Sequence, residues 1–127
     1  MTKTILVVED EESLLNIIEK KLSISGFKVL TARDIDQSLK CLKEFEDVAC
    51  IWLDHYLLGK KNGLDLLIEV KGNSKWKDIP IFVVSNTAGS DKIKSYLELG
   101  VEKYYTKSDY SLGQIIADIK KELKFEE

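Results

Sequence analysis

The sequence predicts an α/β fold with a single five-stranded parallel sheet and helices on both of its faces. Over 127 residues, short apolar runs alternate five times with segments whose apolar residues recur at helical spacing. Such strand–helix alternation is typical of doubly wound domains with right-handed crossovers. The length suits one domain over residues 1–127, and we find no repeat, low-complexity segment or linker.

The first two strand–helix units occupy the N-terminal part of the chain. Residues 5–8 form a continuous apolar run, as expected of a strand buried on both faces. The next helix ends at Gly26 and carries apolar residues at helical spacing: Leu14, Leu15, Ile17, Ile18 and Leu22. Residues 27–31 form a second strand. Asp34 is expected to cap a second helix in a capping box with Gln37, ahead of an apolar stripe of Ile35, Leu39 and Leu42.

Three more units follow. Residues 49–53, 81–84 and 102–105 form the strands, the middle one preceded by Pro80, where a missing N–H is tolerated. The last strand is the most polar, which predicts an edge position. Gly100 ends the helix before it. The apolar residues that mark the three helices are Leu64, Leu67 and Ile68, then Ile93 and Leu97, then Leu112, Ile115, Ile116, Ile119 and Leu123.

The composition narrows the class of protein. A net charge of −3 and a pI near 5.3 argue against direct binding of nucleic acid, which basic patches mediate. No apolar stretch approaches the roughly 20 residues of a membrane helix, and the first residues lead into a strand rather than a signal peptide. Cys41 and Cys50 match no metal or redox spacing and are expected to be reduced core residues. We therefore expect a cytoplasmic globular protein without membrane contact.

Polar residues follow four of the five predicted strands. They are Glu9-Asp10 after the first, Asp54-His55 after the third, Ser85-Asn86-Thr87 after the fourth and Thr106-Lys107-Ser108 after the fifth. Ligands of such folds bind outside the carboxyl ends of the strands. We therefore expect three carboxylates, a hydroxyl and an ammonium at one edge of the sheet.

This set of groups suits one kind of chemistry. Three adjacent carboxylates repel one another unless a cation neutralises them, and oxygen ligands without His or Cys favour Mg²⁺ or Mn²⁺. An aspartate beside Mg²⁺ can attack phosphorus and give an aspartyl phosphate. The metal and a lysine then offset the charge of the transferring group. The residue types therefore indicate phosphoryl transfer to a carboxylate.

Over essentially its whole length the sequence resembles the receiver domains of bacterial response regulators. Ile-Leu-Val-Val-Glu-Asp-Glu at residues 5–11 resembles their first strand and acidic pair, and Asn-Gly-Leu-Asp-Leu-Leu at residues 62–67 resembles the start of their third helix. The resemblance implies a role for each matching residue. Glu9, Asp10, Asp54 and the backbone carbonyl of Tyr56 would bind the metal, Asp54 would accept the phosphoryl group, Ser85 and Lys107 would contact it, and Ser85 and Tyr104 would move on activation.

The same resemblance implies a flavodoxin-like strand order of 2-1-3-4-5, Mg²⁺ (or Mn²⁺) as cofactor, and a phosphohistidine donor on a sensor histidine kinase or histidine phosphotransfer protein. The phosphoryl group would bias a two-state equilibrium that a downstream protein reads on the face of the fourth helix, fifth strand and fifth helix. The protein would be a signalling switch, catalysing only its own phosphorylation and dephosphorylation. It would be a monomer or a phosphorylation-dependent dimer without an output domain.

The sequence departs from the family at four places. Leu57-Leu58 stand where the family has Met-Pro, and Gly63 lies one residue further from Asp54, so residues 58–61 are expected to hold an insertion. Asn86 stands where a small residue is common. Ser108 follows Lys107 at the position where the family usually has a proline in a cis peptide. Because a cis bond before serine costs about 3–4 kcal/mol, we expect a trans bond, or a cis bond held under strain.

Two other functions remain open at this stage. A pseudo-receiver that binds partners without phosphorylation is suggested by the missing prolines, although such a module needs neither the acids nor the lysine. A phosphatase of the haloacid dehalogenase type would carry Asp-x-Asp after its first strand, whereas this chain has Glu9-Asp10-Glu11 and no cap domain.

Single residues also have plainer interpretations. Glu9 and Asp10 could begin a helix, and Asp54 could end a strand in a turn. Ser85 could be a turn residue, Lys107 a surface lysine and Tyr104 half-buried surface. We expect His55 to be exposed at the loop mouth, Trp52 to lie in the core, and Glu11-Glu12 and Lys60-Lys61 to be solvated.

Overall fold

The computed structural model describes residues 2–86 and 89–124. Its elements are β1 (Thr4–Val8), α1 (Glu12–Ile24), β2 (Lys28–Ala32), α2 (Ile35–Glu44), β3 (Val48–Leu53), α3 (Gly63–Lys71), β4 (Ile81–Ser85), α4 (Ser90–Glu98), β5 (Lys103–Thr106) and α5 (Leu112–Glu122). All four strand pairings are parallel, in the order β2-β1-β3-β4-β5. The predicted fold and strand order are confirmed, and each strand end lies within one residue of its predicted position.

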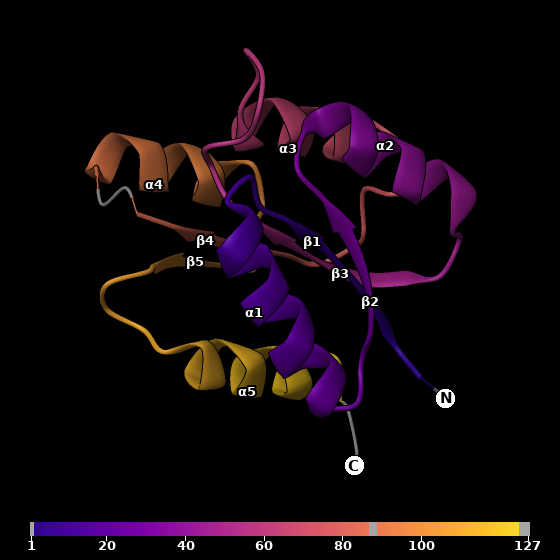
Figure 1. The fold of residues 1–127 in the computed structure, drawn as a ribbon. Coiled ribbons are helices and arrows are strands. Elements are labelled where there is room, and N and C mark those ends of the chain that lie inside the picture. The colour runs from indigo at the N-terminus through magenta and orange to yellow at the C-terminus, as the bar shows by residue number, and fades with distance from the viewer. Residues whose placement is uncertain (1, 87–88, 125–127) are drawn as a thin grey trace.

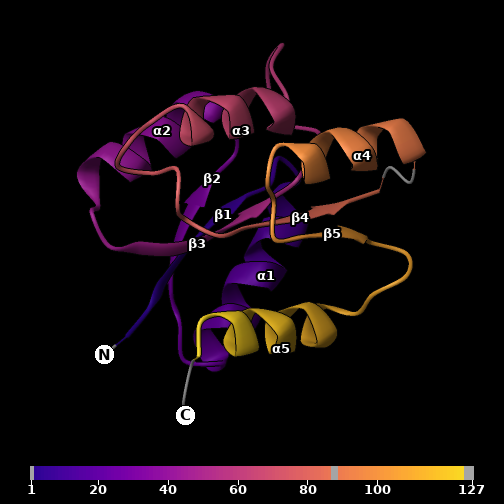
Figure 2. The same ribbon diagram turned by 180° about the vertical axis from the view of Figure 1, so that it is seen from behind.

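Helices cover both faces of the sheet. Figures 1 and 2 show α2, α3 and α4 on one face and α1 and α5 on the other. Alternate strand residues point to the two sides. Leu6, Ile51 and Val83 pack under α2, α3 and α4, whereas Val7, Trp52 and Phe82 pack under α1 and α5. The predicted core position of Trp52 is thereby confirmed.

Local signals begin and end the helices as expected. Asp34 accepts a hydrogen bond of 2.8 Å from the backbone N–H of Gln37 at the start of α2. The side chain of Gln37 accepts from the N–H of Arg33 rather than from that of Asp34, so the expected reciprocal box is displaced by one residue. Gly26 and Gly100 follow α1 and α4 with φ of 101° and 92°, a conformation that glycine adopts without strain.

Three apolar residues expected on buried stripes are exposed instead. Ile17, Ile68 and Leu97 expose 48%, 57% and 50% of their surface. Each lies beside a buried or core-facing neighbour on its helix, such as Ile18 or Tyr96. Successive helical residues are rotated by about 100°, so a residue at the edge of the apolar stripe turns toward solvent while its neighbour faces the sheet.

The remaining composition-based expectations concern cysteines and membranes. Cys50 is buried and Cys41 is partly buried against the core, and both are free thiols. Glu11, Glu12, Lys60 and Lys61 are exposed, as predicted. Within the described ranges, no helix has the length and apolar character needed to cross a membrane.

Candidate functional site

The carboxyl ends of four strands place the predicted site residues together. Glu9 follows β1, Asp54 follows β3, Ser85 ends β4, and Lys107 follows β5. Parallel-sheet hydrogen bonding continues beyond the strands: the N–H of Asp54 donates to the carbonyl of Val8 at 2.9 Å, and that of Lys107 donates to the carbonyl of Ser85 at 2.9 Å. The sheet therefore fixes the backbone on which the functional side chains stand.

The ammonium of Lys107 lies between two of the acids. Its Nζ donates to Glu9 Oε1 at 2.8 Å and lies 3.6 Å from Asp54 Oδ2. Burial disfavours the charge of Lys107, but the hydrogen bond to Glu9 and the attraction of Asp54 outweigh it, so the pKa of Lys107 lies above its usual value. A charged ammonium thus stands beside the predicted phosphoacceptor.

The three carboxylates outnumber this single cation. Glu9, Asp10 and Asp54 each offer an oxygen within 4.8 Å of the others. Burial is the main cause that raises the pKa of all three acids, and it outweighs the effect of Lys107. Repulsion from Asp54 raises the pKa of Glu9 further, and repulsion from Glu9 raises that of Asp10. The cluster therefore favours a further positive charge when all three acids are ionised.

Asp54 also has an unused acceptor. Its Oδ1 is buried and has no hydrogen-bond partner among residues 2–86 and 89–124. A buried carboxylate oxygen without a partner is costly unless a ligand meets it. Three hard oxygen donors around such an atom fit Mg²⁺ or Mn²⁺, which take oxygen ligands.

Ser85 and Tyr104 lie beside this cluster. Ser85 is fully buried, and a hydrogen bond from its side chain favours the ionised form of Asp54. Tyr104 on β5 is half-buried; burial raises its pKa, and a side-chain hydrogen bond with Ser85 acts against that shift. Its ring centroid lies 5.6 Å from that of Tyr96 on α4. Ser85 and Tyr104 therefore connect the acidic cluster to α4.

The expectation for His55 was wrong, because this side chain is buried rather than exposed. Strand alternation turns the residue after Asp54 toward the face that α4 covers, where Nδ1 lies 2.6 Å from the hydroxyl of Tyr96. Burial lowers the pKa of His55, with Lys92 acting in the same direction, so its ring is predominantly neutral at pH 7. The sequence around His55 contains no local mark of this partner, which lies 41 residues away.

The loop between β3 and α3 accommodates the departures near Asp54. Figures 1 and 2 show this segment projecting beyond the helices beside it. Leu57 is buried, whereas Leu58 is exposed and Gly59 has φ +89°. The loop closes where the N–H of Gly63 donates to the carbonyl of His55 at 2.8 Å. The added length is therefore directed away from the acidic cluster.

Tyr56, Asn86 and Ser108 lie in the segments that follow β3, β4 and β5. Tyr56 exposes its ring, over which the ammonium of Lys92 lies 5.3 Å from the centroid, and metal binding by its carbonyl stays a prediction. There is no cis peptide bond in the described part of the chain, so the trans bond expected before Ser108 is confirmed. Asn86 is exposed, and Thr87 lies outside the described residues.

Sequence reasoning missed Arg33, which contacts the site through a backbone atom. Its Nε and Nη2 donate to the carbonyl of Asp10 at 3.1 and 2.6 Å. A side chain that binds a main-chain carbonyl does not require a particular partner residue. No motif could therefore have revealed this contact.

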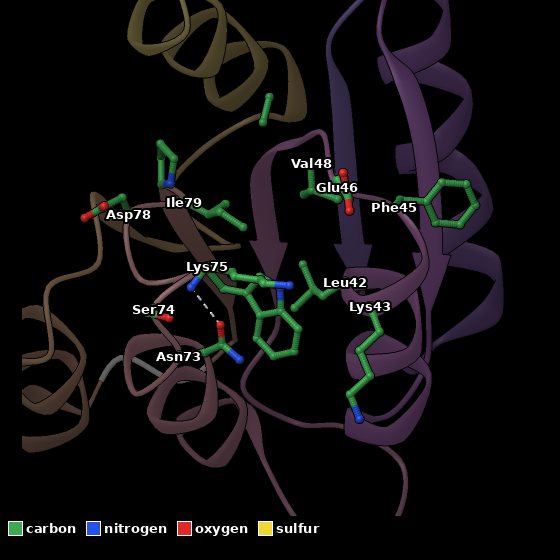
Figure 3. A pocket seen from close by; sticks show the side chains of 13 residues that line it. Leu42, Lys43, Phe45, Glu46, Val48, Asn73, Ser74, Lys75, Asp78 and Ile79 are labelled. Atoms are coloured by element: carbon green, nitrogen blue, oxygen red, sulfur yellow. Dashed lines mark hydrogen bonds between the residues drawn. The ribbon is translucent and has the colours of Figure 1, made fainter.

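A wide cavity lies remote from the acidic cluster. It has a volume of about 910 Å³ and opens where β3 and β4 begin, at the opposite edge of the sheet. Figure 3 shows side chains from the end of α2, the start of β3 and the segment before β4 around it, among them Leu42, Val48 and Ile79. Ligands of doubly wound sheets bind at the carboxyl edge instead. The acidic cluster around Asp54, and not this cavity, therefore lies at the edge where such sheets bind their ligands.

Comparisons with known proteins agree with this architecture. The chemotaxis protein CheY1 of Helicobacter pylori is 31% identical over 104 residues, which make up 81% of this chain and 83% of that protein. The alkaline phosphatase synthesis transcriptional regulatory protein PhoP of Bacillus subtilis is 33% identical over 120 residues, 94% of this chain and 48% of that protein.

A solved structure and a family model extend the likeness. The Mn(2+)-bound form of response regulator Rcp1 superposes with a TM-score of 0.80 at 29% identity, over 98% of this chain and 97% of that chain. Residues 5–120 match the model of the response regulator receiver domain. The fold, the acidic edge of the sheet and these matches together show that the chain belongs to the response regulator receiver domain family.

Proposed function

We propose that this receiver domain accepts a phosphoryl group on Asp54 from a phosphohistidine of a partner protein, with Mg²⁺ as cofactor. The observation that carries the proposal is the state of Asp54. Its carboxylate is buried, one oxygen has no hydrogen-bond partner among the described residues, and the other lies 3.6 Å from the Lys107 ammonium. A carboxylate with a purely structural role would have both oxygens paired.

The transfer requires an attacking oxygen and neutralisation of charge. A carboxylate oxygen of Asp54 attacks phosphorus, an O–P bond forms, the N–P bond of the phosphohistidine breaks, and the imidazole leaves with the electron pair and takes a proton. Glu9, Asp10 and Asp54, with the carbonyl of Tyr56, would hold Mg²⁺, which neutralises charge on the phosphoryl oxygens when bound. The Lys107 ammonium stabilises the same charge from the side of β5.

The product would then act as a switch. A phosphoryl group on Asp54 offers new acceptor oxygens to Ser85. In the unphosphorylated protein, the side chain of Ser85 forms hydrogen bonds with Asp54 and Tyr104. Because the ring of Tyr104 packs near Tyr96 of α4, a shift of Ser85 would reposition groups on the α4-β5-α5 face. A downstream protein that prefers one arrangement of this face would read the phosphorylation state.

The donor would be a sensor histidine kinase or a histidine phosphotransfer protein. The domain would act as a signalling switch that promotes only its own phosphorylation and dephosphorylation. Beyond the missing prolines, nothing favours a phosphorylation-independent binding module, which would require neither the buried acids nor the lysine between them.

The proposal is tested by phosphorylation with a small acyl phosphate. The protein is incubated with the donor and Mg²⁺, and its intact mass is recorded. We expect a gain of one phosphoryl group that is lost in Asp54→Asn and on chelation of Mg²⁺, but kept in Asp36→Asn, which alters an exposed acid of α2. A folded wild-type protein that gains no phosphoryl group from this donor or from phosphorylated histidine kinases would overturn it.

A further inference from the structure

We propose that Arg33 is a positioning residue of the metal site, which holds the loops bearing Asp10 and Tyr56 at the separation that a divalent cation needs. This inference rests on the proposed function and concerns the same site. Arg33 directly follows β2 and lies beside the β1–α1 loop, residues 9–11, without belonging to the acidic cluster itself.

The guanidinium of Arg33 binds the β1–α1 loop at one atom, the carbonyl oxygen of Asp10. Nη2 and Nε both donate to the carbonyl of Asp10, at 2.6 and 3.1 Å. Two donors of a rigid planar fork fix the direction of that carbonyl better than one flexible ammonium could. Because the carbonyl and the side chain of Asp10 share one Cα, fixing the first limits where the second can point.

The backbone of Arg33 holds the neighbouring loop. Its carbonyl accepts from the N–H of Leu58 at 3.2 Å, two residues after Tyr56. Its own N–H donates to the side chain of Gln37 at 2.8 Å, which ties it to the start of α2. Arg33 thus joins the start of α2 to two loops, one bearing Asp10 and the other bearing Tyr56. Both loops are proposed to supply metal ligands.

The ion pair with Glu12 does not account for this arrangement. Arg33 Nη1 lies 3.9 Å from Glu12 Oε2, and the two side chains are 37% and 74% exposed. An exposed pair of this kind contributes little. The two hydrogen bonds of the guanidinium with the Asp10 carbonyl are therefore the contacts that give the Arg33 side chain its role.

Charge and positioning predict opposite effects of removing Arg33. As a charge alone, the guanidinium repels a cation at the neighbouring carboxylates, so its removal would tighten metal binding. As a positioning group, it keeps Asp10 in place, so its removal would weaken metal binding. The direction of the change in metal affinity therefore distinguishes a charge from a positioning group, whatever the size of the change.

The test is a Mn²⁺ titration of the full chain followed by electron paramagnetic resonance of the free ion. Arg33→Gln removes the fork and the charge, and Arg33→Lys removes only the fork. Lys40→Gln, at an exposed position of α2, removes a charge without touching either loop. We expect both Arg33 variants to bind Mn²⁺ about tenfold more weakly than the wild type, and Lys40→Gln to bind it equally well or slightly more tightly.

A second readout separates metal positioning from general loss of structure. In phosphorylation by acyl phosphate, the Mg²⁺ concentration for half-maximal rate should rise about tenfold in the Arg33 variants, while the rate at saturating Mg²⁺ is kept. Circular dichroism checks the fold of each variant, and Arg33→Lys decides the question if Arg33→Gln unfolds.

Three results would overturn the inference. Arg33→Gln that binds Mn²⁺ as well as the wild type, or more tightly, shows that the guanidinium does not position the metal site. An unchanged Mg²⁺ midpoint in Arg33→Lys has the same meaning. A wild-type protein that binds no Mn²⁺ contradicts the inference and the proposed metal together, whereas Mn²⁺ binding without phosphorylation contradicts the proposed function alone.

Discussion

His55 Nδ1 and the hydroxyl of Tyr96 lie 2.6 Å apart, with both side chains buried. This hydrogen bond joins the residue after Asp54 to the one buried residue within Ser90–Glu98, which forms α4. The ring of Tyr96 also lies near that of Tyr104 on β5. The attachment of α4 to the sheet is therefore concentrated at a single tyrosine, close to Asp54, the proposed phosphoacceptor.

Tyr96→Phe should destabilise the domain by about 1–3 kcal/mol, because it leaves the buried Nδ1 of His55 without a hydrogen-bond partner while the ring packing is kept. Urea unfolding measures the change. Tyr56→Phe removes a hydroxyl from an exposed ring and serves as the control, with an expected change within about 0.5 kcal/mol. Equal stability of Tyr96→Phe and the wild type would show that water replaces the tyrosine hydroxyl.

Gly63→Ala should destabilise the domain by about 1–3 kcal/mol through overpacking. A Cβ at this position would lie 2.5 Å from the Tyr96 hydroxyl and 2.7 Å from the carbonyl of Asp54. Gly113→Ala is the matched control on α5, where the nearest atom to a new Cβ is 3.9 Å away. The control should gain about 0.5–1 kcal/mol from helix propensity. Thermal unfolding of both variants gives the comparison, and a stabilised Gly63→Ala would refute the close packing.

Asp54→Asn should stabilise the metal-free domain at pH 7, by about 0.5–2 kcal/mol. Burial raises the pKa of Asp54 above its ordinary value of 3.8, so the folded state binds the proton more tightly than the unfolded state. The domain therefore loses folding stability as the pH rises above 3.8 and Asp54 ionises. The neutral amide in the Asp54→Asn variant avoids this loss. Chemical unfolding with a chelator present measures the difference.

Mg²⁺ should narrow the difference in unfolding free energy between Asp54→Asn and the wild type, because it binds the folded wild type more tightly than the folded variant. Asp36→Asn, at an exposed position, is the control for removing a negative charge. A less stable Asp54→Asn in the absence of metal would mean that the attraction between Asp54 and Lys107 exceeds the cost of burial.

Tyr105→Phe should cost about 1 kcal/mol at pH 7, because the Tyr105 hydroxyl donates to Asp118 Oδ2 at 2.7 Å. This hydrogen bond holds the pKa of Asp118 below its ordinary 3.8. A depressed carboxyl pKa gives stability that is present above 3.8 and is lost as the pH falls through the lower folded value. Urea unfolding at pH 7 and pH 3 should therefore give a smaller difference at pH 3. A difference independent of pH would exclude ionised Asp118 as the partner.

The sequence was sufficient for the sheet and for its acidic edge, because both depend on local patterns. Buried strands such as β1 are continuous apolar runs, and the acids directly follow them. Parallel strands bring those positions together whatever the details of the loops. Glu9, Asp54, Ser85 and Lys107 therefore met as expected.

The contacts that the sequence did not reveal join distant or main-chain atoms. His55 was expected at the surface, because only the placement of Tyr96, 41 residues later, makes its burial favourable. Arg33 was overlooked because its partner is a carbonyl. Periodicity also exaggerated the buried faces, since Ile17 and Leu97 continue an apolar pattern past the width that the sheet covers.

The most direct test of the central claim locates the phosphoryl group. After reaction with acyl phosphate and Mg²⁺, borohydride reduction converts an aspartyl phosphate to homoserine, and peptide mass spectrometry identifies the altered residue. We expect homoserine at position 54 in the wild type, and none in Asp54→Asn or without Mg²⁺. Modification at another residue, or none in a folded wild-type protein, would contradict the claim.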